Sequence, residues 1–193
     1  MPSHARFIFD QLASQVRSIA SLASQPANQT MSDTLCRCAV VLTVSALDTY
    51  MHELGAEILH TYASRGANEA SVVAQYIRSG SAASVQGPKG RAHLEFELLT
   101  RTLTDPDQID KLLTASGKVA DDVWRQTGIA LRRRERDLKS AINAQVLRRN
   151  AIAHHGDWDA VQIAFRHLSV GECTSALNDM ESIVHAFDKV MGY

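Results

Sequence analysis

Proline, cysteine and aromatic side chains are all scarce in this 193-residue chain. The four prolines leave room for long helices, and the three cysteines are too few, and odd in number, for a disulfide framework. We recognise no signal peptide, so we expect reduced thiols and a cytoplasmic protein. The apolar run at residues 38–47 is much shorter than the roughly 20 residues of a membrane-spanning helix. We therefore expect a soluble protein without a membrane partner.

Net charge is also close to zero. The formal charge is −1, so the chain as a whole does not resemble a strongly basic nucleic-acid-binding protein. The charges are unevenly distributed, because residues 125–149 contain eight basic and two acidic residues, whereas residues 150–193 contain two basic and six acidic ones. The basic segment is either a solvated helix face or a surface that binds nucleic-acid phosphates. In the second case the binding residues are Arg132, Arg133, Arg134, Arg136 and Arg148.

Apolar side chains recur at helical spacing along four long segments. The segments predict the four main helices of an all-α bundle, over residues 4–24, 34–62, 134–154 and 172–191. The second helix is apolar on most sides, which places it at the centre of the bundle, and Ser32 or Asp33 is its expected N-cap. Because the chain is too short for two sizeable cores, we expect one domain.

The middle of the chain, about residues 66–128, is predicted to be an insert within this domain. Turn residues at 79–90 predict a mobile loop. On either side of that loop, helical spacing and the Asp105-Pro106 cap predict short helices, over residues 69–78, 92–103, 107–115 and 118–127. After the long basic helix, residues 155–159 are a predicted turn and residues 160–168 allow an extended conformation. Ser169 is the expected cap of the last helix.

The basic helix ends in the sequence RRNAIAHHGD, residues 148–157. Asn150 and His154 are four residues apart and share one face of a helix. Arg149 lies about 140° around the axis from His154, so its long side chain must reach around the helix end to meet the histidine. A histidine exchanges protons near neutral pH, and an arginine holds phosphate oxygens with a permanent charge and a two-pronged donor. Together they suit phosphodiester chemistry that needs no metal.

Arg149, Asn150 and His154 match the R-N-x-x-x-H motif of the HEPN superfamily of RNases and toxins. The Gly-Asp turn after the motif makes the chain most similar to the RiboL-PSP group of that superfamily. A second match is VSALDTY at residues 44–50, which resembles a "SALE-x-Y" stretch of that group. There an acidic residue faces the motif helix, and Asp48 takes its position. Specific matches are confined to these two places, and the insert matches nothing that we can name.

The resemblance implies a HEPN-like helical bundle, a two-fold homodimer that joins two motifs in one cleft, and RNA cleavage without a cofactor. The implied catalytic residues are Arg149, Asn150, His154 and Asp48. We therefore expect a metal-independent endoribonuclease, acting as a toxin or an anti-phage defence effector and restrained by an antitoxin or another partner protein. The alternative is a non-catalytic dimerisation module, since arginine and histidine near a helix C-terminus also stabilise the helix dipole, by roughly 0.3–1 kcal/mol each.

Other polar and aromatic residues give weaker signals. Cys36 and Cys38 lie about 200° apart on a helix, so they cannot face one metal ion and are expected to be buried thiols. We find no cluster with the spacing of metal ligands. Trp124 and Trp158 either stack on RNA bases or pack in the core or an interface. His155 falls outside the motif spacing and is at most a supporting residue.

Overall fold

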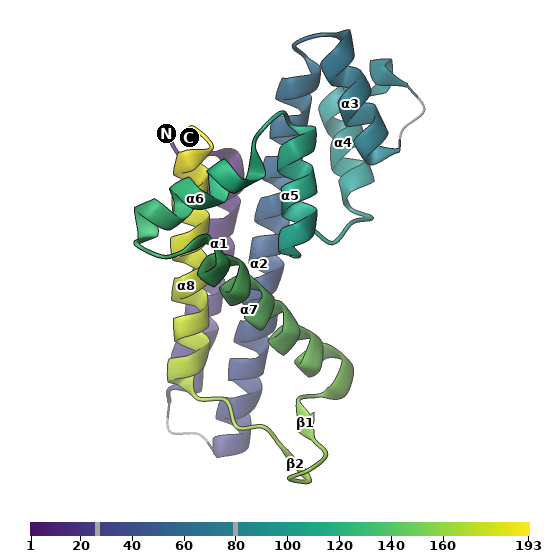
Figure 1. Cartoon of the computed structure of the whole chain (residues 1–193). Coiled ribbons are helices and arrows are strands. Elements are labelled where there is room, and N and C mark those ends of the chain that lie inside the picture. The colour runs from purple at the N-terminus through teal and green to yellow at the C-terminus, as the bar shows by residue number, and fades with distance from the viewer. Residues whose placement is uncertain (26–27, 79–80) are drawn as a thin grey trace.

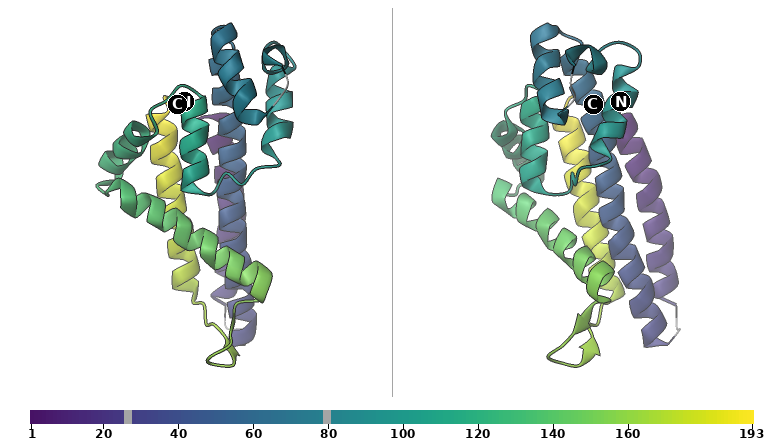
Figure 2. Two further views of the ribbon diagram at one scale, coloured as in Figure 1. Left: turned by 45° about the vertical axis from the view of Figure 1, so that its right-hand side comes forward. Right: turned by 90° about the vertical axis from the view of Figure 1, so that its right-hand side faces the viewer.

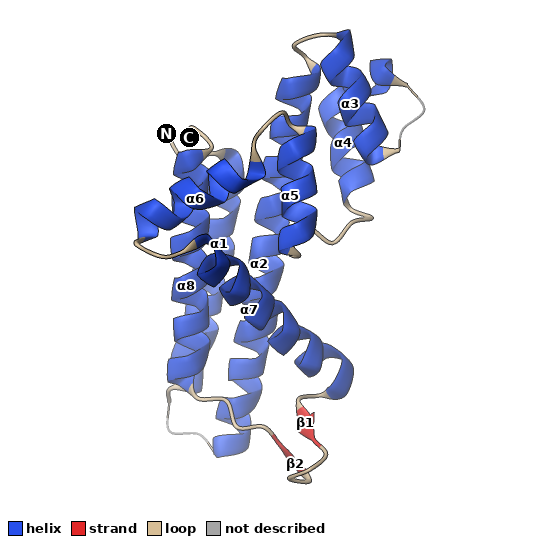
Figure 3. Cartoon of the chain, in the orientation of Figure 1, coloured by secondary structure: helices blue, strands red, loops and turns tan. Residues whose placement is uncertain are grey.

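The computed structural model describes residues 1–25, 28–78 and 81–193, and this part of the chain is almost entirely helical (Figure 1, Figure 3). The predicted all-α fold is confirmed. The α-helices are α1 (His4–Ala23), α2 (Gln29–Ala63), α3 (Ala67–Ile77), α4 (Gly90–Leu98), α5 (Pro106–Ala115), α6 (Ala120–Leu131), α7 (Glu135–His155) and α8 (Val170–Val190). A 3-10 helix η1 (Ala82–Val85) precedes α4, and strands β1 (Trp158–Asp159) and β2 (Ala164–Phe165) form a small hairpin between α7 and α8. The two termini lie at one end of the bundle and the hairpin at the other (Figure 1).

Helix α2 is the centre of the bundle, as its apolar sequence predicts. It packs against α1, α8 and α7 along part of its length and against α3, α4 and α5 nearer its C-terminal end (Figure 2). Fifteen of its 35 residues are buried. By length and composition α2 would also pass for a membrane span, but the contacts with six other helices account for its apolar character.

Helix α2 begins at Gln29, five residues before the predicted start at residue 34. Asn28 is the N-cap, because its side-chain oxygen accepts a hydrogen bond from the backbone N–H of Met31 at 2.9 Å. The prediction of Ser32 or Asp33 as the cap was therefore wrong. Ser32 lies inside the helix, where its hydroxyl donates to the carbonyl oxygen of Ala23 at 2.8 Å and joins the ends of α1 and α2.

Within the predicted insert, α3, α4 and α5 pack on the C-terminal half of α2, whereas α6 packs on α8. Two histidines of α2 contact the insert. Nε2 of His52 lies 3.0 Å from the carbonyl oxygen of Leu98, and Nε2 of His60 lies 3.0 Å from that of Gly87. The prediction of a loop at 79–90 was partly wrong, because η1 forms within it and Val85 is buried in the core. Ser79 and Gly80 lie outside the described residues.

Several predicted helix ends also differ from the structure. The helix predicted over residues 92–103 is α4 and ends at Leu98, and the one predicted over residues 118–127 is α6 and extends to Leu131. The predicted caps at Asp105 and Ser169 are confirmed, the latter as a reciprocal capping box with Glu172.

The exposure of the side chains tests the predictions that Cys36 and Cys38 are buried and that Trp124 either stacks on RNA bases or packs in the protein. Cys36 and Cys173 are buried with their sulfur atoms 3.5 Å apart, and burial raises the pKa of Cys36 to about 12. Cys38 is exposed, so the prediction that it is buried was wrong: α2 is not covered on every side there. Trp124 is fully buried and packs edge-on against Phe187, with ring centroids 5.5 Å apart, so it belongs to the core.

Replacing Leu98 by alanine should lower the free energy of unfolding by about 2–5 kcal/mol, because its fully buried side chain packs beside Gly55 of α2. The neighbouring change Leu99→Ala is the matched control. It should cost less than about 0.5 kcal/mol, because Leu99 is 72% exposed. Urea unfolding followed by circular dichroism measures both. Since we expect one domain, each variant should show one transition; a separate early transition for Leu98→Ala would contradict this.

Candidate active site

The motif residues lie on the part of α7 that is least buried. Only Leu138 and Ile142 of its 21 residues are buried, and both lie in the first half of the helix. Arg149 and Asn150 are partly exposed, and His154 is exposed in the last turn. In the described part of the chain none of the three makes a hydrogen bond from its side chain or an ion pair, and Nε of Arg149 is buried without a partner. The motif side chains are therefore free to bind something else.

Helix α7 ends immediately after His154 and His155 for a backbone reason. Gly156 adopts the left-handed conformation, with φ +60°, and its N–H donates to the carbonyl oxygen of Ile152 at 3.0 Å. Asp157 follows with φ +62°, and its N–H donates to the carbonyl oxygen of Ala151 at 3.1 Å. This tight turn ends the helix and keeps Asp157 close to the last turns of α7, where its side chain meets Arg148.

The carboxylate of Asp157 is fully buried between two arginines. One of its oxygens, Oδ2, accepts a hydrogen bond from Nη2 of Arg148 at 2.8 Å and lies 3.4 Å from Nε of Arg37 on α2. Two guanidinium groups thus meet one carboxylate, which leaves a surplus of positive charge beside the motif. The same cluster links the end of α7 to the N-terminal part of α2.

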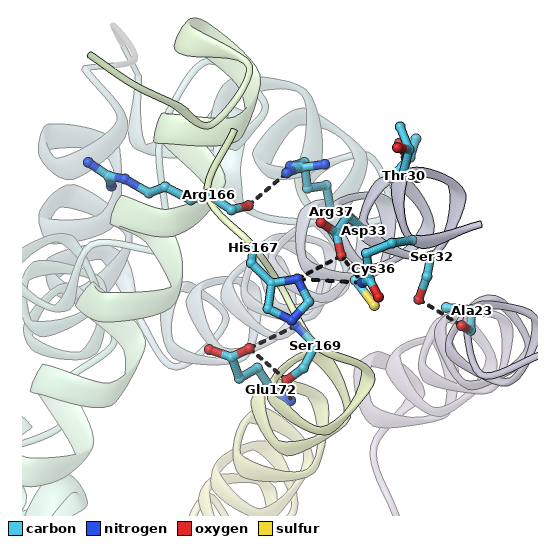
Figure 4. Close-up of polar contacts among 12 residues, drawn as sticks. Ala23, Thr30, Ser32, Asp33, Cys36, Arg37, Arg166, His167, Ser169 and Glu172 are labelled. Carbon is cyan, nitrogen blue, oxygen red and sulfur yellow. Dashed lines mark hydrogen bonds and ion pairs between the residues drawn. The ribbon is translucent and has the colours of Figure 1, made fainter. Parts of the chain in front are cut away.

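Arg37 also holds the segment that follows the hairpin. Figure 4 shows its guanidinium directed at the carbonyl oxygen of Arg166, to which Nη2 donates at 2.7 Å. One residue later, Nδ1 of His167 lies 3.0 Å from Oδ1 of Asp33 (Figure 4). Burial raises the pKa of Asp33, but hydrogen bonds with Gln29 and His167 outweigh that effect, so the pKa lies below its usual value. The carboxylate is therefore charged at neutral pH and fastens this segment to α2.

Asp48 occupies a different environment from the other predicted catalytic residues. Its Oδ1 lies 3.6 Å from Nδ1 of His52, one turn further along α2. Among the described residues, no hydrogen bond or ion pair joins Asp48 to Arg149 or His154. A single copy of the chain thus brings three of the four predicted catalytic residues together on one helix end and leaves Asp48 without a direct bond to them.

The five predicted RNA-binding arginines differ in their ion-pair partners and in their exposure. Arg133 forms an ion pair with Asp179 of α8, and Arg148 is engaged by Asp157. Exposed side chains remain at Arg132, Arg134 and Arg136, of which the last two pair with Asp137 on the surface of α7. Arg132, Arg133 and Arg134 line one hollow of about 490 Å³ at the turn between α6 and α7, together with Arg125. Arg148 lies about 21 Å further along the α7 axis than Arg134.

A larger hollow of about 620 Å³ lies between α7 and α8. Its lining includes Arg148, Gln145 and Asn178 but not the motif residues Arg149 and His154. The motif therefore lies outside this hollow, on a surface that a ligand or a second chain can reach.

One group of side chains has the geometry of a metal site, although the sequence gave no sign of it. The ligand atoms of Asp10, Glu181 and His185 lie within 4.8 Å of one another between α1 and α8. Each residue already has a partner: His185 lies 2.7 Å from Asp10, and Glu181 pairs with Arg17. Asp10 lies in the first half of α1, and Glu181 and His185 lie in the second half of α8, so the group is on the side of the bundle that leads to the chain termini. It is too remote to take part in chemistry at the motif.

Sequence reasoning missed Arg37 and undervalued Asp157. Asp157 directly follows the glycine that ends the motif helix, so the sequence identifies it as a turn residue. The sequence does not show that its carboxylate is buried. Arg37 is 120 positions away and belongs to no motif, so only the packing of α2 against α7 could reveal their contact.

Comparison with models of known protein families identifies a family for this chain. The family model described as RiboL-PSP-HEPN matches residues 7–193, which is nearly the whole chain and includes the insert. No curated protein and no solved structure matches the chain.

Replacing Asp157 by asparagine should lower the free energy of unfolding by on the order of 3 kcal/mol, because two arginines lose their buried counter-charge. The comparison variant is Asp122→Asn, which removes an exposed pair with Arg125 and should cost at most about 1 kcal/mol. Chemical unfolding of the two variants and the parent gives both values. Equal stabilities of the two variants would show that the cluster does not hold the end of α7.

Proposed function

The chain belongs to the RiboL-PSP-HEPN family, and we propose that it is a metal-independent endoribonuclease with Arg149, Asn150 and His154 as its catalytic residues. The observation that carries the proposal is the contrast between two neighbouring arginines. Arg148 is engaged by the buried Asp157, whereas Arg149, five residues before the exposed His154, has no ion-pair partner in the described chain. A cation and a proton-transferring group are thus both available at the end of α7.

The proposed reaction is attack of a ribose 2′-oxygen on the adjacent phosphorus. The bond from phosphorus to the 5′-oxygen breaks, which gives a 2′,3′-cyclic phosphate and a 5′-hydroxyl group. One proton leaves the 2′-hydroxyl and one joins the 5′-oxygen, and His154 is suited to either transfer. Arg149 stabilises the negative charge that develops on the phosphate oxygens. Asn150, one turn before His154, orients the imidazole. Asp48 stays the fourth proposed site residue on the family resemblance alone, because within one chain it contacts His52 on α2.

A single His154 cannot take one proton and donate the other at the same moment, so we propose a homodimer with its two-fold axis near α7. The exposure of α7 supports this arrangement. No residue after Ile142 in this helix is fully buried, and Leu147 is 68% exposed. Leu147 lies seven residues before His154 and on the same face of the helix. A second copy would cover this face and bring its own His154.

The family membership also supports a biological role for such an enzyme. An RNase in the cytoplasm damages its own host unless it is restrained, so we propose a toxin or anti-phage defence effector that an antitoxin or another partner protein controls. The competing function is a catalytically inactive module that uses the α7 face only to dimerise. A nuclease assay on the purified protein separates the two.

Replacing His154 by alanine should lower the maximal cleavage rate by on the order of 10²- to 10⁴-fold and leave RNA affinity nearly unchanged. The parent should cut RNA but not DNA, retain its activity in excess EDTA, and leave 2′,3′-cyclic phosphate ends. Gel assays and mass spectrometry of the products measure these properties. If the alanine variant cuts as fast as the parent, His154 is not the catalytic residue. If the purified parent cuts no RNA, the inactive-module alternative is preferred, and loss of activity in EDTA would exclude the metal-free mechanism.

Replacing Leu147 by aspartate should convert the dimer into a monomer, because an exposed apolar contact becomes a buried charge. The variant should also lose cleavage although Arg149 and His154 are intact. Leu99→Asp is the control, since Leu99 is as exposed but lies just after α4. Sedimentation at micromolar concentration without RNA gives the mass. A monomeric parent would rule out the proposed pairing.

The double change Arg134→Ala and Arg136→Ala should weaken RNA binding and flatten its dependence on salt, because each phosphate contact releases condensed counterions. The rate at saturating RNA should stay nearly constant, since these arginines lie too far from the motif to touch the reacting phosphate. Fluorescence anisotropy at several salt concentrations measures the effect. An unchanged salt slope would assign the two arginines to a solvated helix face.

A further inference from the structure

The hairpin that follows the motif helix exposes two aromatic rings. Trp158 is 44% exposed and Phe165 is 61% exposed, whereas the only other tryptophan, Trp124, is fully buried. Phe7 and Phe96 are similarly exposed, but Trp158 and Phe165 are adjacent, and a contiguous pair of exposed aromatic rings is a candidate binding surface. The sequence leaves open whether Trp158 packs in an interface or stacks on bases, and the surroundings of the two rings distinguish these roles.

The two rings are held in a fixed arrangement. Trp158 and Phe165 are directly opposite each other in the hairpin, with ring centroids 5.2 Å apart and planes at 82°. Asp159 fixes the turn, because its Oδ1 accepts hydrogen bonds from the backbone N–H groups of Val161 and Gln162 at 2.9 and 3.1 Å. A rigid aromatic pair loses little conformational entropy when it binds a flat ligand.

The rings lie at the end of the motif helix. A Cβ atom added to Gly156 would be 3.7 Å from Cε1 of Phe165, so this ring rests against the residue that terminates α7. Trp158 is only four residues after His154. A nucleic-acid strand whose scissile phosphate lies at Arg149 and His154 must therefore pass close to the hairpin.

The surroundings of the rings are cationic. The guanidinium carbon of Arg37 lies 5.5 Å from the centroid of Phe165, and Arg37 and Arg148 share the single carboxylate of Asp157. Arg149, which is unpaired in the described chain, adds a further positive charge. Aromatic rings among arginines suit unpaired bases joined by phosphates, because every base has a flat face and every linkage is an anion.

From these observations we propose that Trp158 and Phe165 form a stacking platform for unpaired bases, so that the substrate is single-stranded RNA. The proposal rests on the RNase function proposed above and specifies its substrate class. Bases in a duplex are already stacked on one another and are not available to the rings. RNA strands with exposed bases next to the cleaved bond are thus bound in preference to duplexes.

Binding is tested with the His154→Ala variant, so that the RNA probe is not cut. A 12-nucleotide single-stranded RNA should quench the fluorescence of Trp158, while the buried Trp124 stays unaffected. The same RNA in a perfect duplex should quench little. Adding Trp158→Ala should weaken binding of the single strand at fixed salt by roughly five- to a hundredfold, and Trp158→Phe should retain most of the affinity because phenylalanine also stacks.

The matched control is Ile163→Ala on the same hairpin. Ile163 is 76% exposed and apolar but has no aromatic face, so its removal should not change RNA affinity. If Trp158→Ala and Ile163→Ala both convert the dimer into a monomer and leave RNA affinity unchanged, the hairpin is a protein interface and the proposal is overturned. Equal affinity for single-stranded and duplex RNA would overturn it as well.

The stacking-platform proposal and the RNase proposal can fail separately. If the parent never cuts RNA but Trp158 is quenched by single strands, the stacking platform stands and the RNase proposal fails. If the parent cuts RNA and Trp158→Ala changes neither KM nor kcat, the RNase proposal stands and the platform fails.

Discussion

Burial of the central helix α2 is the constraint on which the rest of the structure depends. The helix is 35 residues long and buries 15 of them on several sides, so no single neighbour can cover it. Helices α1 and α8 cover its length in the bundle, and the insert covers its C-terminal half. Apolar burial stabilises a fold by roughly 25 cal/mol per Å² and is the dominant favourable term in folding, so α2 has to be covered. The insert therefore contributes to the core, although neither of the two stretches that resemble the family, residues 44–50 and 149–154, lies within it.

Covering α2 leaves α7 at the edge of the bundle. This helix buries two residues of its first half, and its second half is held by the partly buried Val146 and Ile152 together with polar contacts. Asp157 is central to them because its buried carboxylate links Arg148 at the end of α7 to Arg37 on α2. Charge pairing sets the orientation of the motif where apolar packing is thin. The arrangement leaves the motif surface open and links the end of α7 to α2.

The arginines of α7 show how ion pairing separates residues that look equivalent in sequence. Arg148 and Arg149 are adjacent and differ by about 100° around the helix. That rotation directs Arg148 to a buried carboxylate, while Arg149 has no such partner in the described chain. In the connection between α6 and α7, Arg133 likewise meets Asp179 of α8, whereas its neighbour Arg132, the C-cap of α6, stays exposed. Position in the fold, and not residue type, decides which guanidinium groups remain available for phosphate.

The sequence by itself determined the helical class, the main helices, the caps at Asp105 and Ser169, and the resemblance that the family match confirms. These features depend on neighbours within a few residues, such as helical periodicity and a side chain bonded to a nearby N–H group. The start of α2 was misplaced because the sequence analysis considered only Ser32 or Asp33 as its cap, whereas the side chain of Asn28 accepts a hydrogen bond from the N–H of Met31. Only the tertiary structure decided that Trp124 is buried while Trp158 is exposed, and that Arg37 meets Asp157. Those outcomes depend on which helix faces cover one another, and residues 120 positions apart leave no local signal of such a contact.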